Sequence, residues 1–348
     1  MAKIINGIQQ MGIGVADAGQ VFDWYRKHLG FDILVFEDVA PANLMTRYTG
    51  DIVRDRYALL ALNMIGGGGL EIWQFKNRTP EPPLHQLQLG DLGINVMKLR
   101  AKNIKSIYEN LMGHDLNLRT PIYGCSHFFL TDPWHNWVQM VQEDYRFAKT
   151  KRTSGGVLGA VIGVSHMEDS LLFYGKLLGY NIVESDRTEV FDDFSNLPGG
   201  KGRFRRVLLK HGERPVGGFG ELYGPSQIEL VQSLDRRPAP IYQGRMWGDL
   251  GYIHLCFDVR GMDALRKEAE HLGHPLTVDS AESFDMGDAA GRFGYIEDPD
   301  GTLIELVETH KVPIFKRLGI YIDLKNRHPS KPLPKWLVKM MRVHRVRD

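Results

Sequence analysis

Three segments with the alternating pattern of β-strands each carry one side chain that could bind a metal. In QIELVQ, HLCFDV and TLIELVE, apolar residues occupy one face, and Glu229, His254 and Glu305 lie on the other. One imidazole and two carboxylates form a ligand set for divalent cations. Carboxylates buried together repel one another unless a cation or protons compensate. The pattern predicts a metal site with Glu229, His254 and Glu305 as ligands.

An internal repeat indicates how these segments are positioned. Residues 14–31 match residues 163–180 at a constant offset of 149, and several shorter motifs recur in the same order further along. Repeats of this kind indicate duplicated structural units. We therefore predict two homologous domains, at residues 5–145 and 157–309. A polar linker at 146–156 joins them, and a basic tail follows at 310–348.

Each predicted domain contains two units of strand, helix and three further strands. The first strand is MGIGV or AVIGV, and the helix after it ends at Gly30 or Gly179, because glycine readily adopts the left-handed conformation that terminates helices. This order predicts an α+β fold in which each domain forms a curved, cup-like mixed sheet. Helices would cover the outer face and leave the inner face free for a ligand.

These segments resemble the vicinal oxygen chelate superfamily, which includes glyoxalase I, bleomycin-resistance proteins and extradiol dioxygenases. In the second domain the resemblance rests on GVSHMEDSLLFYGKLLGY, IELVQ, GYIHLCFDV and IEDPDGTLIELVE. In the first it rests on MGIGVADAGQVFDWYRKHLGF, LEIWQ and TDPWHNWVQMVQ. It implies tandem glyoxalase-like domains and a small-molecule substrate with adjacent oxygen atoms.

The resemblance also implies four ligand positions, on the first, fourth, fifth and eighth strands of one domain. The second domain offers Gly159, Glu229, His254 and Glu305 at these positions, and the first offers Gln10, Glu71, Ile94 and Gln139. The second set keeps three ligating residue types, whereas the first contains no histidine. We therefore expect the metal in the second domain, and a degenerate site in the first domain where Glu71 is structural or lines a pocket.

The expected ligand set favours acid–base chemistry. A bound Zn²⁺, Mn²⁺, Fe²⁺ or Ni²⁺ would polarise two adjacent substrate oxygens while Glu229 or Glu305, as the catalytic group, moves a proton, as in isomerases and lyases. Oxygen activation by non-haem iron prefers two histidines and one carboxylate. Two alternatives stay open: a ring-cleaving dioxygenase, and a metal-free cup that binds a small molecule as resistance proteins do.

Composition excludes several other classes of protein. Lys and Arg number 43 against 42 Asp and Glu, a balance that argues against a nucleic-acid-binding protein. Two cysteines are too few for a disulfide scaffold or a cysteine-rich zinc site. No signal peptide or long apolar run is visible, so we expect a cytoplasmic protein.

The basic tail is the remaining feature of the sequence. Residues 311–348 hold 11 Lys or Arg and 2 Asp or Glu, which leaves residues 1–310 with a net charge of −8. Residues 334–346 could form an amphipathic helix. We expect this helix to dock on its own acidic body or on a second subunit in a homodimer; an anionic membrane surface is the less favoured alternative.

Overall fold

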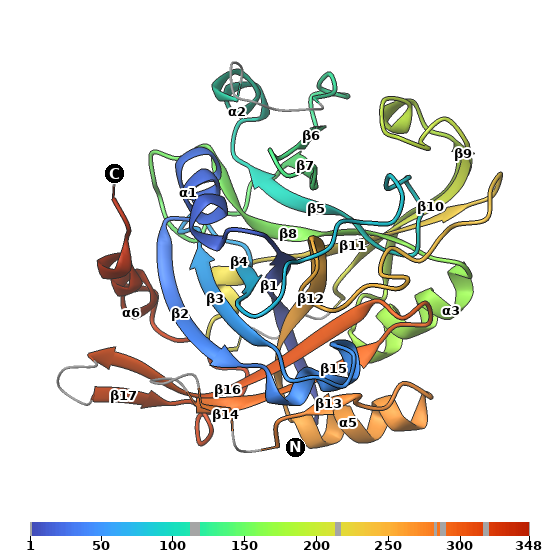
Figure 1. The fold of residues 1–348 in the computed structure, drawn as a ribbon. Coiled ribbons are helices and arrows are strands. Elements are labelled where there is room, and N and C mark those ends of the chain that lie inside the picture. The colour runs from blue at the N-terminus through green and yellow to red at the C-terminus, as the bar shows by residue number, and fades with distance from the viewer. Residues whose placement is uncertain are drawn as a thin grey trace.

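The computed structural model describes residues 2–111, 119–212, 217–281, 284–285, 290–315 and 320–347. Its strands form two curved mixed sheets, and each sheet combines segments from both halves of the chain (Figure 1). The α+β fold with curved glyoxalase-like sheets is confirmed. We expected each domain to form its own sheet, whereas each observed sheet contains strands from both halves of the chain.

Sheet 1 contains the first and the last strands of the chain. Its strands are β1 (Ile4–Gly14), β2 (Ile33–Pro41), β3 (Asp55–Leu62), β4 (Gly69–Phe75), β12 (Gly251–Arg260), β13 (Val278–Asp279), β14 (Phe284–Asp285), β15 (Ala290–Glu297), β16 (Leu303–Phe315) and β17 (Ile320–Asp323). They follow the order β13-β15-β16-β12-β1-β4-β3-β2, with β14 on β15 and β17 on β16. The antiparallel pair of β1 and β12 joins the two halves at the centre of the sheet.

Sheet 2 contains the middle strands. They are β5 (Gly93–Ala101), β6 (His127–Thr131), β7 (Trp137–Gln142), β8 (Ser154–Gly163), β9 (Ile182–Val190), β10 (Arg203–Lys210) and β11 (Gln227–Ser233), in the order β6-β7-β5-β8-β11-β10-β9. The antiparallel pair of β5 and β8 is the central junction. Strand β8 begins at Ser154, so the last three residues of the predicted linker belong to a strand.

Each sheet therefore contains strands from both predicted domains. The domain boundaries describe the sequence repeat, and they stay a prediction. The central edge of β1 could pair with either β5 or β12, since both strands begin a repeat unit with a similar pattern. In the structure β1 pairs with β12. Within each half of the chain, an equivalent buried hydrogen bond links the two repeat units: Tyr25 donates to Asp132 at 2.8 Å in the first half, and Tyr174 donates to Asp298 at 2.9 Å in the second.

Helices pack on the sheets as the repeat predicts. The bounds are α1 (Ala18–Leu29), α2 (Ile104–Asn110), α3 (Met167–Leu172), α4 (Gly220–Tyr223) and α5 (Met262–His271), with a π-turn at Phe173–Leu177 and short 3-10 turns at Asn43–Tyr48 and Asp192–Phe194. Helix α1 begins at Asp17, whose carboxylate accepts the Gln20 amide at 2.9 Å. Gly30 and Gly179, at φ angles of 73° and 76°, adopt the left-handed conformation expected of them.

The basic tail folds back on both halves of its own chain. The predicted helix is shorter than expected: α6 (Lys335–Lys339) passes into a 3-10 turn at Met340–His344. Val338 packs in a cluster with Ile33, and Arg345 forms an ion pair of 3.3 Å with Asp32. Of the two docking surfaces expected, its own body receives the tail here, and the homodimer stays a prediction. Among the described residues, no helix is long and apolar enough to cross a membrane.

Candidate metal site

His254 lies at the centre of sheet 1, on strand β12. The strand has an irregularity at Ile253, where the pairing with β1 shifts register. His254 lies opposite Gly12 of β1 and is fully buried. A Cβ atom at Gly12 would come within 2.5 Å of the imidazole, so the ring can occupy this position only because residue 12 has no side chain.

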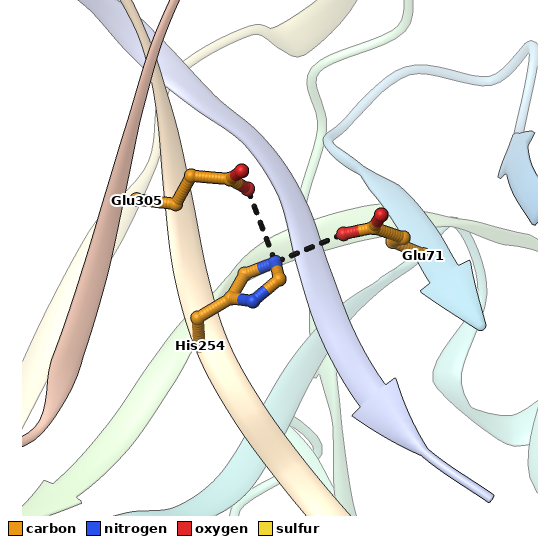
Figure 2. A group of neighbouring side chains, drawn as sticks. All are labelled: Glu71, His254 and Glu305. Atoms are coloured by element: carbon orange, nitrogen blue, oxygen red, sulfur yellow. Dashed lines mark ion pairs between the residues drawn. The ribbon is translucent and has the colours of Figure 1, made fainter. Parts of the chain in front are cut away.

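Glu71 and Glu305 both direct a carboxylate towards the same imidazole nitrogen, as Figure 2 shows. Glu71 is paired with Gly12 across β4 and β1, and Glu305 is paired with Cys256 across β16 and β12. One carboxylate oxygen of each glutamate lies 3.1 Å from His254 Nε2. The potential ligand atoms of the three residues lie within 4.8 Å of one another, and no other such group of His, Cys, Asp and Glu occurs in the described part of the chain.

A glutamine, Gln10, contacts both carboxylates of the cluster. The Gln10 amide nitrogen donates to Glu71 Oε2 at 3.0 Å and to Glu305 Oε2 at 3.3 Å. A half-turn of the amide would exchange its NH₂ group for its carbonyl oxygen, which is a cation ligand. Gln10, Glu71, His254 and Glu305 therefore offer three oxygen ligands and one nitrogen ligand from four adjacent strands.

The charges of the cluster are unbalanced without a cation or an added proton. Burial lowers the pKa of His254, but the carboxylates of Glu305 and Glu71 raise it more strongly, and the resulting pKa is about 10. Burial raises the pKa of Glu305, but the facing imidazolium lowers it below its ordinary value. The buried carboxylate of Glu305 and the partly exposed carboxylate of Glu71 therefore hold one proton on the imidazole, where a divalent cation would satisfy both.

The position of His254 Nε2 tests whether a metal would fit. This buried atom makes no well-aligned hydrogen bond, although it lies equally close to both carboxylates. A single N–H group can point straight at only one of the two acceptors, whereas a cation placed among the three groups can contact all of them. The donor set, the burial of His254 and the lack of a well-aligned hydrogen bond at this nitrogen fit a divalent cation.

Aromatic side chains enclose the imidazole. The Trp247 ring is nearly parallel to it, at 18° and 6.2 Å between centroids, and Tyr295 packs edge-on at 5.6 Å. The Tyr295 hydroxyl lies 3.4 Å from His254 Nδ1 and can accept its proton when Nε2 serves as a ligand. Trp73 packs against Trp247 at 4.6 Å, so water has little access from this side.

Two cavities lie near this part of the molecule. The larger, of about 1180 Å³, borders Gly251 and Tyr252 but none of the three clustered residues. The smaller, of about 660 Å³, is lined by Trp247, Ile253 and Leu303 among others, and it too borders none of the three clustered residues. We regard the smaller cavity as the relevant one, because Trp247 contacts His254, and Leu303 precedes Glu305 by two residues on the same strand.

Glu229 lies in sheet 2 and takes no part in this cluster, which corrects the expectation that it converges with His254 and Glu305. Its carboxylate is buried and forms ion pairs with Lys98 and Arg206. Burial raises the pKa of Glu229, but the two cations lower it more strongly, and the resulting pKa is about 2. A carboxylate held by two cations in this way is a poor proton acceptor, so Glu229 is also withdrawn as a catalytic candidate.

The register also corrects one position carried over from the resemblance. Glu71 pairs with Gly12 and Glu229 pairs with Val161, so Gly12 and Val161 are equivalent. Val161 faces Val96 across β8 and β5, just as Gly12 faces His254. The counterpart of His254 in sheet 2 is therefore Val96 rather than Ile94.

Gln10 and Glu71 lie in the cluster, although the sequence predicts a degenerate site around them. They are the first and fourth ligand positions that the resemblance implies for the first domain. The sequence contains one indication that they belong with His254 and Glu305. Neither half of the chain alone supplies four ligating residue types, whereas the first and fourth positions of one half and the fifth and eighth of the other do so together.

The comparisons with known proteins agree with this fold. The family described as Glyoxalase/Bleomycin resistance protein/Dioxygenase superfamily matches residues 7–140 and 156–306. Glyoxalase I from Zea mays is similar in structure, with a TM-score of 0.54 and 14% identity over 88% of this chain and 92% of that one. A Bacillus subtilis protein provisionally named a dioxygenase has the same TM-score and identity over 88% of this chain and 86% of its own. No curated protein sequence matches significantly. The chain belongs to the Glyoxalase/Bleomycin resistance protein/Dioxygenase superfamily.

Proposed function

We propose that this protein is a metal-dependent enzyme that binds one divalent cation through Glu71, His254 and Glu305, with Gln10 as a fourth ligand. The observation that carries the proposal is the buried Nε2 atom of His254, which lies 3.1 Å from an oxygen of each of two carboxylates and makes no well-aligned hydrogen bond. The bound cation would supply Lewis acidity to two adjacent oxygen atoms of a small substrate.

The residues of this chain would orient the substrate and move a proton. The Glu71 side chain is 17% exposed and that of Glu305 is 10% exposed, so Glu71 is the more accessible to a substrate. A carboxylate there can accept a proton from the carbon next to a polarised oxygen and return it to the neighbouring carbon. This chemistry is of the isomerase or lyase type.

The ligand types favour this reaction over ring cleavage. The cluster contains one histidine and two carboxylates, whereas iron sites that activate oxygen typically use two histidines and one carboxylate. The aromatic wall of Trp73 and Trp247 would exclude water from the reacting atoms.

Metal analysis tests the binding half of the proposal. Purified protein should contain about one equivalent of Zn, Mn, Fe or Ni per chain by elemental mass spectrometry, and His254→Ala should lose it. His271→Ala is the matched control, because His271 is exposed at the end of α5 and should leave the metal content unchanged. Metal-free protein that takes up none of these ions on dialysis would contradict the proposal.

Hydrogen exchange tests the catalytic half. In D₂O, the metal-loaded protein should exchange the hydrogen on carbon next to the oxygens of small 2-hydroxycarbonyl compounds, observed by NMR. Glu71→Gln should slow this exchange by roughly 10²-fold or more, because an amide cannot accept the proton. Glu270→Gln, at an exposed glutamate of α5, should exchange at the wild-type rate. An unchanged rate in Glu71→Gln would remove Glu71 from the reaction.

A further inference from the structure

Three segments that are distant in the sequence meet at a strongly basic cavity. The end of α1, the linker and the C-terminal tail together enclose about 420 Å³. Figure 1 shows this region, where α6 and the C-terminus lie beside α1 and β2. The lining residues are Arg26, Asp32, Lys149, Thr150, Lys151, Arg152, Arg342, Arg345, Val346 and Arg347.

One carboxylate in this cavity organises the segments around it. Asp32 is buried, and it forms ion pairs with Arg152 at 3.4 Å and with Arg345 at 3.3 Å. The backbone carbonyl of Asp32 also accepts the amide of Val346 at 2.9 Å. These contacts explain how the tail and the linker are attached to the body, and they account for two of the seven basic side chains.

Of the other five, Arg26 forms an ion pair of 3.0 Å with Asp23, and the Arg342 guanidinium donates to the Lys149 carbonyl at 3.4 Å. Lys149, Lys151, Arg342 and Arg347 form no ion pair with any carboxylate among the described residues. Like charges gathered in one cavity repel one another, and the repulsion grows as water is displaced. Residues 1–310 carry a net charge of −8, so acidic groups for neutralising this cavity are plentiful in the chain, yet Asp32 alone lines it.

We propose that this cavity is a binding site for a ligand with one or more phosphate groups, separate from the metal cluster in sheet 1. Guanidinium groups match phosphate oxygens with paired hydrogen bonds, and lysine ammonium groups add mobile point charges. A cavity of about 420 Å³ has room for a diphosphate group. Because Lys149 and Lys151 lie on the linker and Arg342 and Arg347 on the tail, the ligand would fasten these two segments to each other.

Titration calorimetry with inorganic pyrophosphate tests the site. The full chain is first dialysed against a chelator, so that no cation in the metal cluster can bind the probe. We expect one saturable site whose affinity falls with added salt. The double variant Lys149→Ala, Lys151→Ala should bind at least about tenfold more weakly, because it removes two charge-assisted contacts at exposed positions where folding is undisturbed.

A matched control and a lipid arm complete the test. Lys105→Ala, Lys267→Ala removes two exposed lysines from α2 and α5 and should bind pyrophosphate like wild type. Sedimentation with phosphatidic acid vesicles, against phosphatidylcholine vesicles, separates a lipid headgroup from a free phosphate as the source. Binding in either arm that is lost in the double variant supports the site. The absence of binding in both arms, or binding that the double variant retains, overturns it.

Discussion

The two sheets share the same strand arrangement, but the charge of the glutamate at the equivalent position is balanced differently in each. Glu71 and Glu229 occupy equivalent positions, on the fourth strand of a repeat unit opposite Gly12 or Val161. In sheet 2, Lys98 and Arg206 neutralise Glu229 completely. In sheet 1, Glu71 faces a second carboxylate and one imidazole. The comparison shows that two equivalent glutamates of this chain are held differently, one by two internal cations and the other beside a second carboxylate and an imidazole.

Single residues on the central strands decide which solution applies. Lys98 faces Gly159 across β5 and β8, in the position where Cys256 faces Gln10 in sheet 1. Gly159 itself lies against the backbone of Gln227 too closely for any side chain. Sheet 2 therefore has no side chain at the first position, and a lysine ammonium group lies beside its carboxylate.

The largest effect should come from breaking the internal ion pair of sheet 2. Glu229→Leu leaves the ammonium group of Lys98 buried without a carboxylate, and we expect the free energy of unfolding to fall by about 3–5 kcal/mol in urea denaturation. The metal content of the folded protein should not change, because the cluster in sheet 1 is separate. A loss below about 1 kcal/mol would mean that Lys98 reaches water or another acceptor in the variant.

A smaller effect should appear in the pH dependence of the metal-free protein. His254 has a pKa of about 10 when folded and an ordinary value of 6.5 when unfolded. The stability from its protonated form is therefore complete below pH 6.5 and is lost as the pH rises towards 10. The loss should be on the order of a few kcal/mol in urea titrations.

The variant His254→Gln isolates this contribution. Its unfolding free energy should lack the decline between pH 6.5 and 10 that the metal-free wild type shows. Adding a saturating divalent cation to the wild type should also remove the decline, because the cation replaces the proton on the imidazole. Parallel curves for the wild type and the variant would show that the carboxylates do not hold a proton on His254.

The smallest effect concerns the residue beneath the imidazole. Gly12→Ala places a methyl group where a Cβ atom would lie 2.5 Å from the ring, so His254 must turn away from the carboxylates. We expect metal affinity to fall by about 10–100-fold, as for other losses of ligand orientation. Gly19→Ala is the control, since a Cβ there meets one atom of Asp17 at 3.5 Å. Equal affinities for both variants would show that the ring position does not set the site.

Much of this architecture could be read from local patterns. Alternation placed Glu229, His254 and Glu305 on strands, the family resemblance added the position of Glu71, and the repeat predicted the units, the helix ends at Gly30 and Gly179 and the curved sheets. Each of these features depends on residues within one unit. Patterns within one unit could not predict which residues of different units come together, because this depends on whether β1 pairs with β5 or with β12.

The chain by itself determined the ligand types, since side-chain chemistry and strand alternation belong to each segment. The tertiary structure alone decided that Gln10 and Glu71 join His254 and Glu305, and that Glu229 is neutralised by Lys98 and Arg206. The physical reason is that β5 and β12 present similar hydrogen-bonding edges to β1. Local sequence cannot distinguish two such edges, and the packing of both halves together selects one.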